Sequence, residues 1–297
     1  MADQKIIKPL SILLADDGSE HAQAARQLLC DMPLPEGSSI MAASVVASQK
    51  APDFTFYQMG VEKTGNLLQR KGIEIKTEML IGHPAETLVD TAEKHQVDLI
   101  VMGAKGLRAT LGILLGGVAQ QVVEHVNRPV LIVRAPYKGL GLVLAITDGS
   151  SHSRLAVNYL AHFPLPEKTE VRLVHVLPPL LSPEIYMHAW PIGAEPLPPL
   201  NPIDRDEILA REAEEEKEGQ KLLDDTLERL KSSGVEATGV LLRGDAASEI
   251  IEYAKANQAD LILAGSRGMS QVKGWLMGSL SRKLVHYSAC SVLIVRG

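Results

Sequence analysis

An internal repeat constrains the fold of this chain more than any other feature of its sequence. Residues 241–268, LLRGDAASEIIEYAKANQADLILAGSRG, align without a gap on residues 79–106, MLIGHPAETLVDTAEKHQVDLIVMGAKG. Leu140 to Ile146 likewise match Leu10 to Ala15, and SACSVLIVRG at the end of the chain matches HVNRPVLIVRA. A repeat of this size indicates a duplicated domain rather than a solenoid of short units.

Each copy alternates apolar strands with amphipathic helices. In the first copy, the apolar runs predict strands at Leu10–Ala15, Ser39–Val46, Ile73–Leu80, Asp98–Met102 and Pro129–Arg134. Helical periodicity separates these runs, so we expect βαβ units with right-handed crossovers and a parallel sheet. A short Pro/Gly linker over residues 134–139 divides the copies. We therefore expect domain 1 over residues 1–136 and domain 2 over residues 139–297.

Length, charge and cysteine content restrict the possible partners. A chain of 297 residues is long enough for two domains that each bury a core. The net charge of −6 and the isoelectric point near 5.9 argue against sequence-independent nucleic-acid binding, which needs many Lys and Arg side chains. Cys30 and Cys290 form no metal-ligand pattern and no disulfide framework. No apolar run reaches membrane-spanning length, so we expect a soluble cytoplasmic protein without a membrane partner.

The second copy carries a glycine pattern that is typical of phosphate binding. The apolar strand Asp260–Ala264 ends at Gly265, Gly268 follows in the same turn, and Gly278 and Ser279 open a helix after nine further residues. Glycine lets the backbone approach a ligand closely, and the unpaired N–H groups of a helix start stabilise an anion. A Walker A loop is not indicated, because the Gly-Lys-Ser/Thr ending is missing.

One segment breaks the symmetry of the two copies. The stretch from about residue 177 to 218 is much longer than its counterpart near residues 47–56. Its first part is too rich in proline for a helix or a central strand, and its second part predicts a charged helix with an apolar stripe. The segment is either a surface excursion that feeds this helix, or a lid or docking arm that carries Tyr186, Trp190 and Pro191.

Several of these features resemble the universal stress protein family. They are the tandem arrangement, the Asp-Gly-Ser after each first strand, and the spacing Gly265-x-x-Gly268, nine residues, Gly278-Ser279. The resemblance covers nearly the whole chain except the insert. It implies two tandem Rossmann-like α/β domains of the adenine nucleotide alpha hydrolase-like type, each a five-stranded parallel sheet of order 3-2-1-4-5 flanked by helices. One branch of this family binds ATP, often with a divalent cation, at the carboxyl ends of the strands, where open α/β sheets bind ligands in general.

The resemblance also implies which residues of domain 2 meet the nucleotide. Asp148, with Thr147 before it, would face the adenine or ribose, and Val176 would offer backbone hydrogen bonds to adenine. The loop glycines would line the ribose and first phosphates, the arginine of the loop would add a charge-assisted contact, and the helix start would receive the phosphates through N–H and hydroxyl groups. The full set is Thr147, Asp148, Val176, Gly265, Arg267, Gly268, Gly278, Ser279, Leu280 and Ser281.

Domain 1 keeps the glycine spacing but lacks the two hydroxyl groups. Gly117 stands where domain 2 has Ser279, and Ala119 stands where it has Ser281. The backbone can still bind an anion. We therefore expect either a second, weaker nucleotide site or none, and its residues would be Asp17, Gly103, Gly106, Gly116 and Gly117.

Other polar residues have structural interpretations. His83 and Asp245 precede matching helices and are interpreted as N-caps. Asp148 can be a turn and cap residue as well as a ligand contact. His175 lies within a predicted strand and is interpreted as a hydrogen-bonded core histidine.

No nucleophile–base constellation for catalysis is evident in the sequence. We therefore expect a stress-response sensor or signalling protein that binds ATP, or AMP or ADP, with Mg or Mn as a candidate metal. Two alternatives stay open: a slow ATPase or nucleotidyl transferase that uses the same pocket, and a protein-interaction scaffold that acts through the Pro-rich insert. The resemblance further implies that the two copies pair through their last strands as a pseudo-dimer, and that whole chains could form a homodimer.

Overall fold

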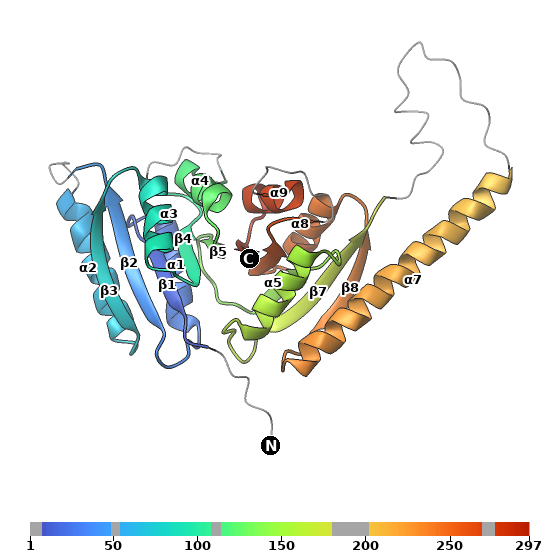
Figure 1. Cartoon of the computed structure of the whole chain (residues 1–297), viewed down its shortest axis with the longest axis horizontal. Coiled ribbons are helices and arrows are strands. Elements are labelled where there is room, and N and C mark those ends of the chain that lie inside the picture. Colours follow the sequence, from blue (N-terminus) through green and yellow to red (C-terminus); the bar gives the residue numbers. More distant parts are fainter. Residues whose placement is uncertain (1–7, 49–53, 108–113, 180–201, 269–276, 297) are drawn as a thin grey trace, which may run out of the picture.

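The computed structural model of the chain describes residues 8–48, 54–107, 114–179, 202–268 and 277–296, without the side chains of residues 202–208. Strands and helices alternate as the sequence pattern predicts (Figure 1). Domain 1 contains β1 (Ser11–Ala15), α1 (Glu20–Asp31), β2 (Ser39–Val46), α2 (Phe54–Gln69), β3 (Glu74–Ile81), α3 (Pro84–Lys94), β4 (Leu99–Gly103), α4 (Gly117–His125) and β5 (Val130–Val133). Domain 2 contains β6 (Leu142–Ile146), α5 (Ser151–His162), β7 (Glu170–Leu177), α7 (Pro202–Ser232), β8 (Thr238–Arg243), α8 (Ala246–Ala256), β9 (Leu261–Gly265), α9 (Ser279–Tyr287) and β10 (Ser291–Val295).

These strands form one continuous sheet with the order β3-β2-β1-β4-β5-β10-β9-β6-β7-β8. Each domain therefore has the predicted order 3-2-1-4-5, and the strands within each domain are parallel. Central strands such as β4 and β9 are apolar runs because side chains on both faces of the sheet are buried in two core clusters. Within each domain, this arrangement gathers the loops that follow the carboxyl ends of the strands at one edge.

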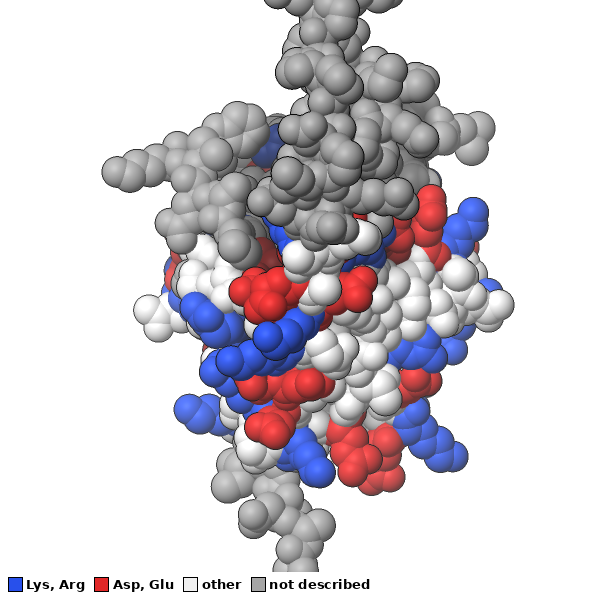
Figure 2. All heavy atoms as spheres, turned by 90° about the vertical axis from the view of Figure 1, so that its right-hand side faces the viewer, with Lys and Arg blue, Asp and Glu red and all other residues white. Residues whose placement is uncertain are grey.

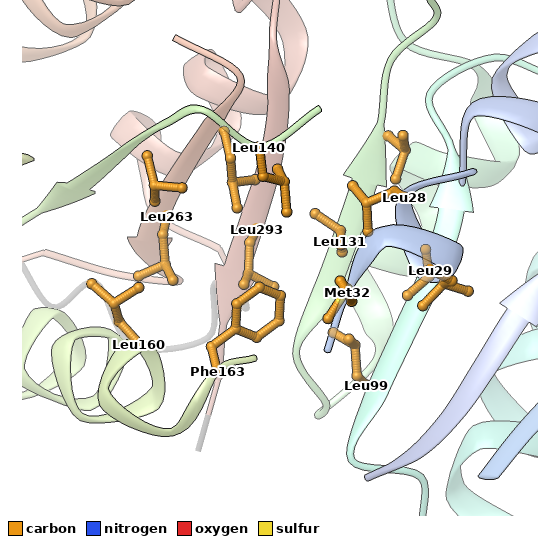
Figure 3. Close-up of a cluster of buried hydrophobic side chains, with 14 of the residues drawn as sticks. Leu28, Leu29, Met32, Leu99, Leu131, Leu140, Leu160, Phe163, Leu263 and Leu293 are labelled. Carbon is orange, nitrogen blue, oxygen red and sulfur yellow. The ribbon is translucent and has the colours of Figure 1, made fainter. Parts of the chain in front are cut away.

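β5 and β10 join the two domains. They pair in antiparallel fashion with Leu131 opposite Leu293, which confirms the predicted pairing of the last strands within the chain. The core continues across this junction, because Leu131, Leu293, Leu140 and Phe163 belong to one cluster of buried side chains (Figure 3). Each of the two strands pairs with backbone N–H and C=O groups that the other would otherwise leave unpaired at the edge of its sheet.

The helix predicted after the insert is confirmed as α7, which extends past the end of the sheet (Figure 1). Its later turns pack on β7 and β8, and Leu223 is buried there. Arg243 of β8 donates a hydrogen bond to Glu215 of α7 at 3.0 Å. Acidic and basic side chains are intermixed on this side of the molecule (Figure 2). The residues of the predicted lid or docking arm lie outside the described residues: Tyr186, Trp190 and Pro191.

Candidate functional site

Domain 2 places its predicted site residues where β6 and β9 end. After β6, the chain turns through Thr147 and Asp148 into α5. The N-cap of α5 is Ser150, whose side chain accepts a hydrogen bond from Ser153 N at 3.1 Å. Asp148 is therefore not the helix cap. Its Oδ1 accepts a hydrogen bond from Ser150 N at 3.0 Å, which is the pattern of an Asx turn.

Two glycines of domain 2, one at the end of β9 and one in the loop after it, lie where a side chain would collide with the protein. A β-carbon on Gly265 would lie 2.5 Å from the carbonyl oxygen of His152. A β-carbon on Gly268 would lie 2.7 Å from Oδ2 of Asp148. The absence of side chains therefore lets the loop after β9 lie directly against the turn after β6.

The start of α9 lies next to this loop. Gly278 N donates to the carbonyl oxygen of Ser266 at 2.8 Å, and a β-carbon on Gly278 would lie 3.2 Å from Cα of Arg267. Gly278 is the N-cap of α9 and has no side chain that could accept hydrogen bonds from the first turn. N–H groups of this kind, beside the exposed Ser279, are suited to an anion.

The structure gives Ser281 a different role from the predicted phosphate donor. Its side chain is buried, and Oγ donates a hydrogen bond to the carbonyl oxygen of Gly265 at 2.7 Å. Because the hydroxyl has a single proton, this bond leaves none for a phosphate, and the residue instead ties the start of α9 to the end of β9. Leu280 is half-buried and Ser279 is exposed, so Ser279 carries the accessible hydroxyl of this helix start.

The ends of β6 and β7 are linked through a histidine. His175 Nδ1 donates to the carbonyl oxygen of Thr147 at 2.8 Å, so the ring is hydrogen-bonded as predicted, but it is half-buried and not part of the core. Thr147 itself is buried. Val176, the next residue of β7, is half-buried and in register with Leu242 of β8. Its backbone therefore lies near the carboxyl end of the strand, as the predicted adenine contact requires.

Positive charge is present at the loop of domain 2. Arg267 is half-buried there. Burial, and next the nearby charge of Arg267, lower the pKa of the Arg296 guanidinium to about 10. An anion bound at this loop would be stabilised by the charge of Arg267.

Domain 1 repeats this backbone geometry. Gly116 N donates to the carbonyl oxygen of Ala104 at 2.8 Å, in the same way as Gly278 N in domain 2. A β-carbon on Gly106 would lie 2.5 Å from Oδ2 of Asp17. The same carboxylate oxygen accepts a hydrogen bond from Leu107 N at 3.1 Å. The glycine loop of domain 1 is thus closed onto the turn after β1.

A cavity of 580 Å³ lies at this edge of domain 1. Apolar side chains form much of its wall, among them Val45, Tyr57, Leu88 and Met102. All residues of the predicted second site line it: Asp17, Gly103, Gly106, Gly116 and Gly117. A cavity of this size, with polar groups gathered at one end, suits a small molecule that has an apolar and an anionic part. The matching loop of domain 2 includes residues 269–276, which lie outside the described residues.

A buried ion pair also reaches the wall of this cavity, although the sequence pattern does not indicate it. Asp16 lines the cavity, and its side chain is completely buried. Its Oδ2 lies 3.9 Å from Nη1 of Arg26 and accepts a hydrogen bond from Thr64, which accepts one from Arg26 at 2.7 Å. The repeat alignment could have revealed this pair, because domain 2 lacks both charged residues together. Thr147 and Val157 stand there at the positions of Asp16 and Arg26.

The two predicted helix caps differ from each other. Asp245 caps α8 as predicted, because its side chain accepts a hydrogen bond from Ser248 N at 3.1 Å. His83 is the N-cap residue of α3, as predicted, but its side chain makes no capping hydrogen bond. Pro84 at the first helical position has no N–H, so it removes one of the groups that a helix start leaves unpaired.

Comparison with known proteins identifies the family. The model of the universal stress protein family matches residues 10–134 and 141–296, which is most of both domains. The chain belongs to the universal stress protein family. The universal stress protein YxiE of Bacillus subtilis is 32% identical over 156 residues, which is 52% of this chain and 97% of YxiE. A universal stress protein of Mycolicibacterium smegmatis is 27% identical over 231 residues, or 76% of this chain and 70% of that protein.

A solved structure shows the same fold. The crystal structure of a universal stress protein from Archaeoglobus fulgidus covers 96% of this chain and 98% of its own, at 21% identity and a TM-score of 0.64. In the described part of the present universal stress protein, no helix has both the length and the apolar character needed to cross a membrane. The same residues contain no group of three or more His, Cys, Asp or Glu that could hold a metal ion.

Proposed function

We propose that this universal stress protein binds ATP or a related adenine nucleotide, mainly in domain 2, and acts as a stress-response sensor or signalling protein. The observation that carries the proposal is the close approach of Gly268 to the carboxylate of Asp148. A β-carbon would fill the space between the loop and this turn. The glycine therefore keeps a cradle at the carboxyl ends of the strands, beside the N–H groups that begin α9.

Several of the predicted residues have specific roles in this proposal. Asp148 accepts hydrogen bonds from the ribose or adenine, and the backbone of Val176 contacts the adenine. The N–H groups at the start of α9, with the hydroxyl of Ser279 and the charge of Arg267, bind the phosphates. Ser281 contributes by fixing the start of α9 to Gly265. A Mg²⁺ or Mn²⁺ ion that arrives with the nucleotide would be coordinated mainly by phosphate oxygens and water.

The proposal gives domain 1 a second, weaker site. Its cavity has the volume for a nucleotide, and its glycine loop has the same geometry. Domain 1 has Ala119 at the position of Ser281, but this difference removes no phosphate donor. In domain 2 the Ser281 hydroxyl already donates its proton to the carbonyl oxygen of Gly265. The weaker binding therefore rests on Gly117, which lacks the accessible hydroxyl of Ser279.

Two measurements on the full chain test the proposal. Native mass spectrometry of the freshly purified protein would show a co-purifying adenine nucleotide and its number per chain. Isothermal titration with ATP and Mg²⁺ should then give one strong site, with any second site clearly weaker. No heat of binding and no bound nucleotide would refute the proposal, and two equivalent sites would refute the ranking of the domains.

A further inference from the structure

In each domain, one buried arginine directly follows the last strand. Arg134 follows β5 and is 7% exposed, and Arg296 follows β10 and is 9% exposed. Burial lowers the pKa of both guanidinium groups. Among the ion pairs of the described residues, neither arginine has a carboxylate partner. Burying a guanidinium without a carboxylate is costly, so its other contacts must compensate.

Arg134 makes these contacts across the domain junction. Its Nη2 donates to the carbonyl oxygen of Val285 at 2.7 Å, and its Nε donates to that of Cys290 at 3.2 Å. Val285 lies in the last part of α9, whose first residues are the proposed phosphate contacts of domain 2. A cation from domain 1 thus binds the carbonyl end of the phosphate-binding helix of domain 2.

Arg296 makes the reciprocal contacts. Its Nη1 donates to the carbonyl oxygen of Val126 at 2.7 Å and to that of Glu124 at 3.4 Å, and its Nη2 donates to that of Val123. These carbonyl groups belong to the last turn and C-cap of α4. Each arginine therefore reaches the end of a helix in the other domain. There it donates to carbonyl groups that have no partner within the helix, at the end where the helix dipole is negative.

Arg134 also contacts the glycine loop of its own domain. Arg134 Nη1 donates to the carbonyl oxygen of Leu114, which lies between Gly106 and Gly116 in the loop of domain 1. The pKa of Arg296 is lowered first by burial and second by the charge of Arg267 in the loop of domain 2. The Arg134 guanidinium thus connects the loop of domain 1 with α9 of domain 2.

We propose that Arg134 is a positioning residue for the nucleotide site of domain 2, and Arg296 for that of domain 1. α9 is short, so a displacement of its carbonyl end also moves the N–H groups of its first turn, beginning with that of Ser279. Domain 1 therefore completes the phosphate site of domain 2 and is more than a degenerate copy. This inference rests on the proposed function, because it assigns these helix starts to the nucleotide.

The first test compares ATP binding by full-length variants. We expect Arg134→Gln to raise the dissociation constant for ATP with Mg²⁺ about tenfold, since a glutamine side chain cannot reach three carbonyl groups. Arg134→Lys keeps the charge without the planar fork and should recover part of the affinity, because one ammonium can still bind some of these carbonyl groups. Leu68→Ala is the control: Leu68 is fully buried in α2 of domain 1, so it lowers stability without touching α9. Thermal unfolding of all variants measures the stability loss.

The second test needs no nucleotide. Amide hydrogen exchange should speed up in α9 of the Arg134→Gln variant and in α4 of an Arg296→Gln variant, each in the domain that does not contain the substitution. Exchange changes confined to the substituted domain would overturn the inference. So would equal affinity in wild type and Arg134→Gln, or an equal affinity loss in Leu68→Ala. Absence of ATP binding by the wild type would instead refute the proposed function, while the exchange data still report on the crossed contacts.

Discussion

Asp148 and Gly268 approach so closely that a β-carbon on Gly268 would lie 2.7 Å from the carboxylate Oδ2. The two residues come from the turn after β6 and the loop after β9, which are far apart in the chain and meet because these strands are neighbours in the sheet. Their contact sets the distance between the proposed ribose-binding carboxylate and the proposed phosphate-binding loop. The contact is repeated in domain 1 by Asp17 and Gly106.

Gly268→Ala should therefore impair nucleotide binding. The added methyl group must displace the loop or the Asp148 carboxylate, at a cost on the order of 1–3 kcal/mol for a clash of this kind. We expect the dissociation constant for ATP to rise about tenfold or more in isothermal titration. Gly60→Ala is the matched control, because a β-carbon on Gly60 in α2 meets nothing within 4 Å. It should leave ATP affinity unchanged and add up to about 1 kcal/mol of stability.

Ser279 and Ser281 should respond differently to alanine. Ser281→Ala leaves the buried carbonyl oxygen of Gly265 without its donor, so we expect a loss of about 1–3 kcal/mol in the free energy of unfolding. Ser279→Ala removes an exposed hydroxyl, so stability should change by less than about 0.5 kcal/mol. Its ATP affinity should nevertheless fall, because a hydrogen bond to a charged phosphate is lost. Chemical denaturation and titration of both variants separate the effects, and the reverse pattern would contradict the assignment.

Local patterns in the sequence predict the strands and the positions of the loops, whereas the strand order 3-2-1-4-5 is implied by the resemblance to the universal stress protein family. Apolar runs separated by helical periodicity define the strands, and the repeat shows that both domains share one order. The glycine spacing predicts the start of α9 at Ser279, which the structure confirms. Such features depend on residues that are neighbours in the sequence, or on a rule about parallel sheets that holds for any sequence.

Other features depend on tertiary contacts that no local pattern encodes. Ser281 donates its hydroxyl proton to the carbonyl oxygen of Gly265, sixteen residues earlier. The sequence alone does not reveal this partner, so it predicts a phosphate donor instead. Asp16 and Thr64 meet across 48 residues. Arg134 contacts α9, 151 residues later, only because β5 and β10 bring the domains together. Side-chain partners at such separations follow from the packing of the whole domain pair.

The ion pair of Asp16 and Arg26 permits a test by residue exchange between the domains. Asp16→Thr should destabilise domain 1 by about 3–5 kcal/mol, because Arg26, whose side chain is 11% exposed, loses its carboxylate. The double variant Asp16→Thr with Arg26→Val installs the residues found at these positions in domain 2. It should recover much of the stability, since removing both charges of a buried pair leaves no uncompensated buried charge. Urea unfolding of both variants measures this coupling, and an additive loss would show that the pair contributes independently.

The stability of the protein should fall as the solution becomes mildly acidic. His21 Nδ1 accepts a hydrogen bond from Ala135 N at 2.9 Å, next to Arg134, and so must be unprotonated at that nitrogen. Burial lowers the pKa of His21 below its ordinary value of 6.5. A hydrogen bond to the backbone of Val133 raises the pKa, and the charges of Lys105 and Arg134 lower it. Below pH 6.5 the unfolded chain therefore binds more protons than the folded chain, so stability is lost as pH falls from 6.5 through the folded pKa.

His286 contributes in the same direction, because burial also lowers its pKa. His21→Gln can keep an acceptor for Ala135 N and does not titrate. We expect its melting temperature to decrease less than that of the wild type between about pH 7 and pH 5. A His21→Gln/His286→Gln variant should flatten the profile further. If the single variant follows the wild-type profile over this range, protonation of His21 does not limit the acid stability of the domain junction.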